Sequence, residues 1–350
     1  MNFVLLFVLA VSIWKMCPRE RKTEDYMGIK QTSAINGIFV LLVFLRHFGQ
    51  YIEYGKYDQI FHALDNKLGQ LIVTTFLLYS GYGMMYSMIN KKNYVNTIPK
   101  RFVRILLQFD CAIVLFVVAN AILGKKYGFA DTLLAFTGWE SIGNSNWYIL
   151  AVLCLYIITF IAGKLCKEKY LMLILSVCLG CFAYIILMKI GGKPRYCYDT
   201  IFCFPVGMLY ALYFDKLNSL LRKRKVYPAV ATMLMFFICV SAHLVQKKLQ
   251  VPFVNLVFVE IKNITFALTI VGVTMMFAIG NPILSWLGKY VFEIYILQRI
   301  PMKLLKNVVE NKYVYFVVCF AITVAISILF KRAEGFIATI KNGKNTRVSV

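Results

Sequence analysis

Long apolar segments recur along the entire chain, and they restrict its fold more than any other feature of the sequence. A helix needs about 20 residues to cross the ~30 Å hydrocarbon layer of a bilayer, and most of these segments approach that length. The sequence therefore predicts an all-α fold, a polytopic transmembrane helix bundle with ten core helices plus one extra N-terminal span. The predicted spans are residues 2–14, 34–52, 68–89, 103–123, 147–163, 170–188, 200–214, 228–246, 263–280, 290–306 and 313–330.

The composition agrees with a membrane protein. Hydrophobic residues make up 60% of the 350 residues and charged residues 16%, with a mean hydropathy of +0.69. A typical soluble domain is about half apolar and about a quarter charged. The formal net charge of +23 raises the question of nucleic acid, but the basic residues lie in short loops where membrane topology explains them. We therefore predict a lipid bilayer around the protein and no nucleic-acid partner.

The distribution of Lys and Arg over the loops predicts an orientation. Alternate loops carry about twice as many basic residues as the loops between them, and the positive-inside rule places the richer set in the cytoplasm. This places the C-terminus in the cytoplasm and the N-terminus outside a cell membrane. A basic cluster follows the first apolar segment and none precedes it, so we expect that helix to be retained. The predicted divisions are an N-terminal segment and basic linker (1–33), a membrane domain (34–330) and a basic tail (331–350).

The ten cysteines carry no recognisable metal or disulfide pattern. Cys178 and Cys181 form a C-x-x-C pair, but it lies inside an apolar segment with no His or acidic residue nearby. Zinc sites and disulfide frameworks have other spacings and settings. We interpret the cysteines as small apolar packing residues and predict no bound metal.

Ionisable side chains inside predicted spans are candidates for function, because charge is costly in lipid. Glu293 and Arg299 each require a partner on another helix or a water-filled cavity. The residues near span ends are expected to reach the interface or to pair structurally: Asp110, Asp199, Glu260 and Lys262.

His47 is the most informative of these residues. It lies about 20 Å along its predicted span from the cytoplasmic end, and an imidazole can act as a general base near neutral pH. Asn36 precedes it by eleven residues, about three helical turns, so the two residues share a face. The alternative is a structural histidine between helices, which is our interpretation of His62 and His243. The adjacent Arg46 favours a functional role for His47.

Six motifs in collinear order over residues 28–330 resemble the bacterial acyltransferase 3 family of integral-membrane O-acyltransferases. The first, NGIFVLLVFLRH, matches the spacing that ends at the family's catalytic histidine, His47, although the family usually has Arg or Lys at Asn36. The other five are FLLYSGYGMMYS around Ser80-Gly81-Tyr82, IPKRFVRIL with Arg101 and Arg104, SNWYILAVLCLY with Asn146 and Trp147, YDTIFCFPVGMLY with Pro205 and Gly207, and LGKYVFEIYILQRIPM, where many members have His at Gln298.

The resemblance implies transfer of an acyl group, most often acetyl from acetyl-CoA, to a carbohydrate hydroxyl. Acetyl-CoA or another acyl-CoA is then the donor substrate, no cofactor is permanently bound, and the acceptor is a surface polysaccharide or a lipid-linked glycan. His47 is expected to deprotonate the hydroxyl or to accept the acyl group covalently, and Arg101 and Arg104 to contact the phosphates of the donor. The remaining expected substrate-binding residues are Asn36, Arg46, Ser80, Asn146, Trp147, Glu293 and Arg299.

Two other interpretations fit much of the same sequence. A transporter or flippase for lipid-linked glycans would also have many helices, charges within its spans and a basic inner surface. A non-catalytic subunit of a polysaccharide assembly complex is supported by Asn36 alone. The sequence leaves open the glycan acceptor, the acyl group and the oligomeric state.

Overall fold

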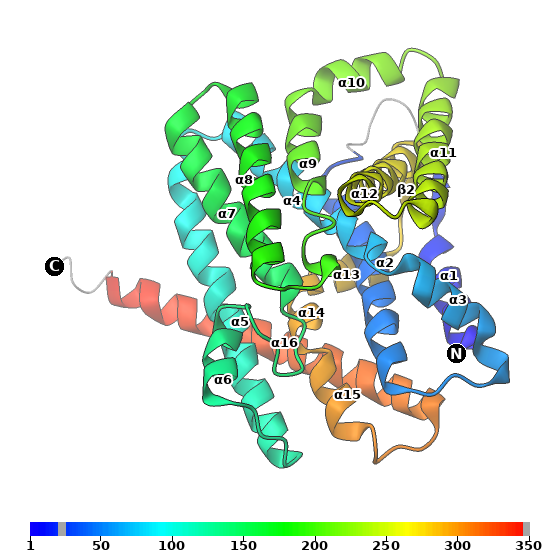
Figure 1. The fold of residues 1–350 in the computed structure, drawn as a ribbon, viewed down its shortest axis with the longest axis vertical. Coiled ribbons are helices and arrows are strands. Elements are labelled where there is room, and N and C mark those ends of the chain that lie inside the picture. The colour runs from blue at the N-terminus through cyan, green and yellow to red at the C-terminus, as the bar shows by residue number, and fades with distance from the viewer. Residues whose placement is uncertain (20–25, 346–350) are drawn as a thin grey trace.

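The computed structural model, which describes residues 1–19 and 26–345, is 79% helical (Figure 1). Within those residues, eight helices are long and apolar enough to cross a membrane. They are α2 (Ile29–Phe48), α4 (Leu71–Asn90), α5 (Ile98–Ile122), α7 (Trp147–Cys166), α8 (Tyr170–Ile190), α11 (Val226–Lys248), α12 (Pro252–Met276) and α16 (Lys312–Asn345). The prediction of an all-α, multi-pass membrane bundle is confirmed.

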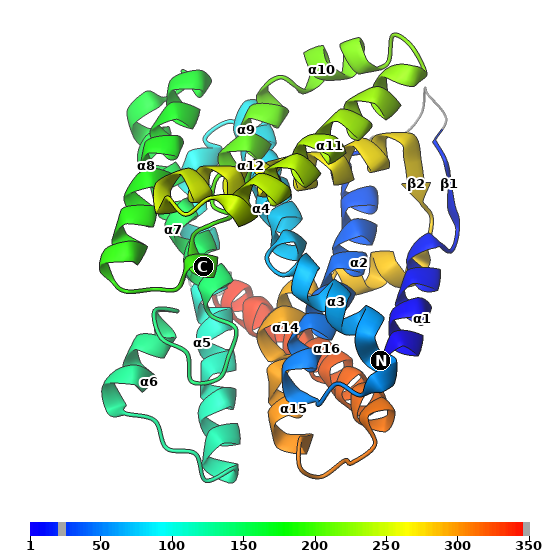
Figure 2. The ribbon, with the colours of Figure 1, turned by 45° about the vertical axis from the view of Figure 1, so that its right-hand side comes forward.

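The other three predicted spans have different forms. Helix α9 (Cys203–Leu212) is short, and so is α1 (Asn2–Ile13), whose 12 residues rise only about 18 Å. Helix α1 continues into strand β1 (Met16–Pro18), which pairs antiparallel with β2 (Phe277–Ile279). Together α1 and β1 run along one side of the bundle (Figure 2).

The predicted span 290–306 is divided into α14 (Val291–Leu297) and α15 (Arg299–Leu305). Pro301 explains the division, because proline has no N–H to donate to the carbonyl of Leu297, four residues earlier, and its ring clashes there. The break falls at Gln298, so Arg299 begins a new helix rather than continuing the first.

Three of the shorter helices lie at the two ends of the bundle (Figures 1 and 2). Helix α10 (Phe214–Leu221) caps one end, and α6 (Phe129–Phe136) lies at the other end with α15. The remaining short elements are α3 (Gln59–Leu68), α13 (Pro282–Gly288), η1 (Gly49–Tyr51), η2 (Lys56–Asp58), η3 (Tyr94–Thr97) and η4 (Arg195–Cys197).

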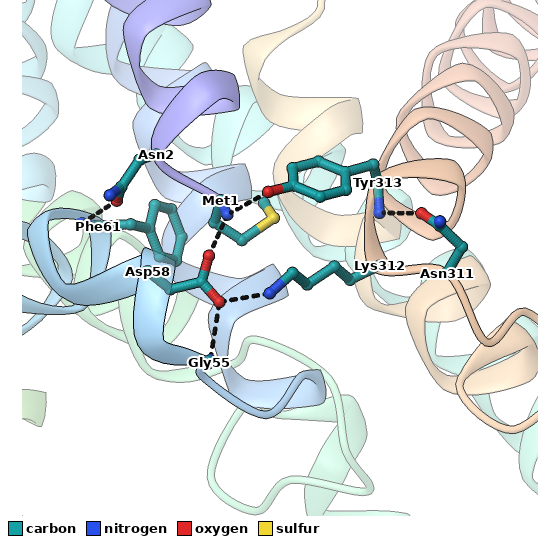
Figure 3. Close-up of polar contacts among 8 residues, drawn as sticks. All are labelled: Met1, Asn2, Gly55, Asp58, Phe61, Asn311, Lys312 and Tyr313. Carbon is teal, nitrogen blue, oxygen red and sulfur yellow. Dashed lines mark hydrogen bonds and ion pairs between the residues drawn. The ribbon is translucent and has the colours of Figure 1, made fainter.

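A buried carboxylate joins three segments that are far apart in the sequence (Figure 3). The Asp58 carboxylate accepts hydrogen bonds from the amino group of Met1 and from Lys312 Nζ, at 2.5 Å, and from the Gly55 N–H, at 2.9 Å. These contacts bring the start of α1, the segment 55–58 and the start of α16 together at one end of the molecule. The predicted topology places the same three segments on one side of the membrane.

Glycines in the recognised motifs allow two pairs of helices to approach closely. A Cβ added to Gly81 of α4 would lie 2.0 Å from the carbonyl oxygen of Phe204 in α9. A Cβ added to Gly207 of α9 would lie 2.0 Å from the carbonyl oxygen of Leu78 in α4. Helices α2 and α13 meet in the same way through Gly37. Small residues allow such backbone contact between membrane helices, so these glycines of the motifs are structural.

The buried side chains form two hydrophobic clusters. One centres on α2, α5, α14 and α16, and the other on α4, α7, α8, α9 and α12. Tyr79, Trp147 and Tyr148 pack against both clusters. Two of these junction residues, Trp147 and Tyr148, also line cavities, each a different one.

Candidate active site

His47 lies at the end of α2, as the last residue but one of that helix. The helix begins at Ile29 rather than at residue 34, so His47 lies about 27 Å from its start. Its side chain is 9% exposed, and Nδ1 is buried without a hydrogen-bond partner among the described residues. His47 is also a lining residue of the adjoining cavity, so part of its side chain reaches that space.

We name that space the His47 cavity. Its volume is about 380 Å³, and its lining includes Arg46, His47, Gln50, Asn146, Trp147 and Arg299. These residues come from the end of α2, from η1, from the loop before α7 and its first residue, and from the start of α15. The lining is polar on several sides, which suits a ligand with many hydroxyl groups better than an apolar one.

Arg299 is held in place by two hydrogen bonds. Its Nε donates to Ser145 Oγ at 2.9 Å, and its Nη2 donates to Gln50 Oε1 at 2.7 Å. The guanidinium thereby links α15, the loop before α7 and η1, which follows α2 directly. Arg46 is fixed separately, because its Nη1 donates to Asp65 Oδ2 at 2.5 Å. Two oriented cations thus border the cavity that contains His47.

The loop that supplies Ser145 is anchored by a buried lysine. Lys303 Nζ in α15 donates to Asn120 Oδ1 of α5 at 2.5 Å and to the carbonyl oxygen of Ile142 at 3.1 Å. The same Asn120 donates from Nδ2 to that carbonyl at 2.9 Å. These buried hydrogen bonds restrict the loop, and so help to hold Ser145 against Arg299.

A second and larger space, which we name the Arg101 cavity, lies nearer the opposite end of α2. Its volume is about 790 Å³, and its lining includes Asn36, Tyr79, Ser80, Lys91, Arg101 and Tyr148. The Arg101 guanidinium lies 4.8 Å from the centroid of the Tyr94 ring. Asn36 Oδ1 is buried without a hydrogen-bond partner among the described residues. Lys91 and Arg101 provide positive charge in a cavity otherwise rich in tyrosine and small polar side chains.

Tyr295 of α14 borders both cavities. Its ring centroid lies 6.1 Å from that of His47 on one side and 5.4 Å from that of Tyr148 on the other. Phe76 continues the row at 6.2 Å from Tyr148, followed by Phe39 at 6.1 Å from Phe76. We name Phe39, Phe76, Tyr148 and Tyr295 the aromatic layer. The two cavities lie toward opposite ends of α2, and Tyr295 of this layer is a lining residue of both.

Comparison with known families decides the class of the protein. The family model described as an acyltransferase domain matches residues 33–332, nearly the whole chain. The chain belongs to the acyltransferase 3 family. No curated protein and no solved structure matches it significantly.

The structure of this membrane acyltransferase distributes the predicted site residues over three places. Five border the His47 cavity: His47, Arg46, Asn146, Trp147 and Arg299. Three border the Arg101 cavity: Asn36, Ser80 and Arg101. Arg104 and Glu293 are not among the lining residues of either cavity. The face shared by Asn36 and His47 is therefore divided between two cavities.

Glu293 and Arg104 have contacts of another kind. Glu293 is buried in α14 and forms an ion pair with Lys331 of α16 at 3.1 Å, the partner on another helix that the sequence required. Arg104 is exposed and interacts electrostatically with Glu334 of α16. The Glu293–Lys331 ion pair therefore joins α14 to α16.

Several lining residues were missed from the sequence. Tyr148 and Tyr295 lie within apolar segments, where tyrosine is common at membrane interfaces, and nothing marks them as internal. Gln50 and Ser145 each lie within three residues of a predicted site residue and act on the site by holding Arg299. Lys91 follows α4 directly, where a basic residue of a loop is explained by membrane topology alone.

Within the described parts of the chain, no group of three or more His, Cys, Asp and Glu side chains is placed to hold a metal ion.

The His47 cavity of this acyltransferase contains the groups that acyl transfer to a hydroxyl requires. An imidazole can take the proton of an attacking hydroxyl, and a fixed cation can stabilise the oxyanion of a tetrahedral intermediate. Both Arg46 and Arg299 interact electrostatically with His47. The site thus combines a buried imidazole with two oriented cations.

Proposed function

We propose that this acyltransferase moves an acyl group, with acetyl as the simplest case, from acyl-CoA to a hydroxyl of a carbohydrate. The donor binds in the Arg101 cavity and the acceptor in the His47 cavity. The observation that carries the proposal is the pair of cavities that meet at Tyr295, with the candidate base on one side only. The acceptor is a cell-surface polysaccharide or its lipid-linked precursor in a bacterial envelope.

The Arg101 cavity suits a large phosphorylated donor. Its volume of about 790 Å³ lies within the range of about 300–1,000 Å³ that is usual for small-molecule sites. Arg101 and Lys91 supply cations for the phosphates of coenzyme A. In the predicted topology this cavity faces the cytoplasm, where acyl-CoA is available. The donor is a substrate here, and the proposal includes no permanently bound cofactor.

The His47 cavity suits a sugar. Amide and guanidinium groups of Gln50, Asn146 and Arg299 can hydrogen-bond to hydroxyls, and Trp147 and Tyr196 offer aromatic rings whose centroids lie 6.2 Å apart. In the predicted topology this cavity faces away from the cytoplasm. An extracytoplasmic glycan would then reach His47 without crossing the membrane.

The reaction balances with the groups present. His47 removes the proton of the acceptor hydroxyl while the hydroxyl oxygen attacks the carbonyl carbon of the thioester. Arg299 stabilises the oxyanion of the tetrahedral intermediate. The carbon–sulfur bond then breaks, and the thiolate of coenzyme A takes the proton from the imidazolium. The products are an O-acyl ester and free coenzyme A, and His47 is again neutral. An acyl-imidazole formed first at His47 leads to the same products.

The two rival interpretations draw less support from the structure than from the sequence. The transporter hypothesis used the charges of Glu293 and Arg299, but Glu293 is paired with Lys331 and Arg299 lies beside His47. The non-catalytic subunit was suggested by Asn36, which borders the Arg101 cavity with an unpartnered Oδ1. An amide oxygen there can still accept a hydrogen bond from a ligand.

The proposal is tested with purified protein in liposomes, radiolabelled acetyl-CoA and a cell-surface glycan extract. We expect the wild-type protein to label the glycan, and His47→Ala to lower the rate by roughly 10²- to 10⁴-fold, the usual contribution of a general base. His62→Ala is the matched control, because His62 lies in α3 with Asn66 as its hydrogen-bond partner at 3.0 Å.

The outcomes separate the alternatives. No label on glycan with several acyl donors would favour the transporter or the non-catalytic subunit. Equal labelling by the wild-type protein and His47→Ala would retain the enzyme but remove the role assigned to His47. A loss of activity in His62→Ala as large as that in His47→Ala would show that the loss is not specific to the cavity.

A further inference from the structure

The aromatic layer contains one residue, Tyr295, that borders both cavities, and this position has a consequence for specificity. We propose that Tyr295 determines which acyl groups pass from the donor to the acceptor, and thus sets the acyl-chain length that the enzyme transfers. The inference rests on the proposed function. It goes beyond it by assigning chain-length selection to one residue.

The contacts of Tyr295 define a wall between the cavities. Its side chain is 5% exposed, and its hydroxyl is buried with no hydrogen-bond partner among the residues that the structure describes. The ring is therefore positioned by packing, mainly against Tyr148 at 5.4 Å and beside His47 at 6.1 Å. Its size and its position, rather than a hydrogen bond of its hydroxyl, therefore set the space between the cavities.

The neighbours of Tyr295 do not occupy the same position. Phe76 and Tyr148 border only the Arg101 cavity, and His47 borders only the other. Removal of the Phe76 or Tyr148 ring would enlarge one cavity, whereas removal of the Tyr295 ring removes a wall that both cavities share. Among the residues that line the two cavities, Tyr295 is therefore the one whose size controls the passage.

The chemistry makes this passage selective. Coenzyme A stays on the Arg101 side and the hydroxyl on the His47 side, so the acyl group must reach across the level of Tyr295 during transfer. An acetyl group adds only one methyl to the reacting carbonyl, whereas each further methylene must fit beside the ring. One methylene too many in a close-fitting pocket changes a rate by roughly 10- to 200-fold. We therefore expect the wild-type enzyme to prefer acetyl.

The test compares acetyl-, butanoyl- and hexanoyl-CoA as donors with the same glycan acceptor. For the wild-type enzyme we expect transfer of acetyl to exceed that of hexanoyl by roughly tenfold or more. Tyr295→Ala should reduce this preference by roughly tenfold or more, because the wall is removed. Tyr295→Phe should keep the wild-type profile, because the ring remains.

A matched control separates selection from general loss of packing. Phe109 is a fully buried ring in α5 that is not among the lining residues of either cavity, so Phe109→Ala should lower stability and leave the chain-length profile unchanged. If Tyr295→Ala does not fold, Tyr295→Leu replaces it and should show a smaller shift in the same direction. Folding is checked by size-exclusion chromatography before each assay.

Three results would overturn the inference. The first is an unchanged acyl-chain preference in folded Tyr295→Ala or Tyr295→Leu. The second is a wild-type enzyme that transfers hexanoyl as readily as acetyl. The third is a change of acyl-chain preference in Tyr295→Phe as large as that in Tyr295→Ala. A wild-type enzyme that transfers no acyl group to any acceptor would instead contradict the proposed function. The two failures are therefore distinguishable.

Discussion

The His47 cavity and the Arg101 cavity lie in the same bundle but differ in size and in the way their charges are held. The Arg101 cavity is about twice as large, at about 790 Å³ against about 380 Å³. In the smaller cavity Arg46 and Arg299 are each fixed by hydrogen bonds to protein side chains. In the larger cavity Arg101 is exposed and contacts an aromatic ring.

This difference indicates a division of labour. Catalysis requires charges that are already oriented toward the place where charge develops, because reorganisation at the moment of reaction is costly. Binding of a large phosphorylated molecule can instead rely on long, exposed side chains that adapt to the ligand. Substitutions in the His47 cavity should therefore affect the chemical step, and those in the Arg101 cavity should affect donor binding.

The largest effect after that of His47 is expected at Arg299. Arg299→Gln keeps a polar side chain but removes the cation and the two-point link to Ser145 and Gln50. We expect kcat to fall by roughly 10²- to 10³-fold, as for loss of one oxyanion-stabilising donor, with little change in the KM for acyl-CoA. Steady-state kinetics with varied acyl-CoA would show this.

Glu293→Gln is the control for Arg299→Gln. Glu293 belongs to the preceding short helix and pairs with Lys331, away from both cavities. Its substitution should lower stability but leave kcat per folded molecule within a few-fold of the wild-type value. A rise in the KM for acyl-CoA in Arg299→Gln, with kcat retained, would contradict the division between the cavities.

An intermediate effect is expected at Arg101. Arg101→Ala should raise the KM for acyl-CoA by roughly 10- to 100-fold, the equivalent of one charge-assisted hydrogen bond, and should leave kcat nearly unchanged. Arg104→Ala is the matched variant, because Arg104 lies one turn further along the same helix and outside the cavity. An equal rise in the KM for acyl-CoA in Arg101→Ala and Arg104→Ala would contradict a donor site formed by the Arg101 cavity.

The smallest effect on transfer is expected at Asp58, which lies in the segment before α3 and borders neither cavity. Burial alone raises the pKa of Asp58, but hydrogen bonds from Lys312, the Met1 amino group and the Gly55 N–H outweigh it and lower the pKa to about 2. The carboxylate therefore contributes stability above its ordinary pKa of 3.8. That contribution is lost as the pH falls from about 4 to about 2.

Asp58→Asn should remove this pH dependence. Thermal unfolding of the wild-type protein should show a decline in Tm over that pH window that is weaker in the variant, and the variant should have a lower Tm at neutral pH. Its transfer rate per folded molecule should remain close to that of the wild-type enzyme. A parallel decline in both proteins would show that other carboxylates dominate.

The sequence predicted the helices better than it predicted their interruptions. Apolar length alone located α2, α4, α5, α7 and α8, because a span must satisfy its own backbone groups within lipid. It did not reveal that Pro301 divides the span 290–306, although a proline inside a helical segment is the usual cause of such a break. The consequence matters, since the division makes Arg299 the first residue of a new helix.

The site was predicted in its parts rather than in its arrangement. His47 and Arg299 were identified because ionisable groups are rare within membrane helices. The division of Asn36 and His47 between two cavities depends on rings contributed by α4, α7 and α14. Tyr295 could not be recognised, because its importance comes from contacts with residues more than a hundred positions away, such as Tyr148, and not from its residue type.

One measurement tests the central claim most directly. Glycan extract is sealed inside proteoliposomes, and radiolabelled acetyl-CoA, which does not cross the bilayer, is added outside. The account places the donor in one cavity and the acceptor in the other, at opposite ends of the bundle. It therefore predicts that the enclosed glycan becomes labelled, and that His47→Ala loses this label. Label that reaches glycan only when donor and acceptor are on the same side of the membrane would contradict the account.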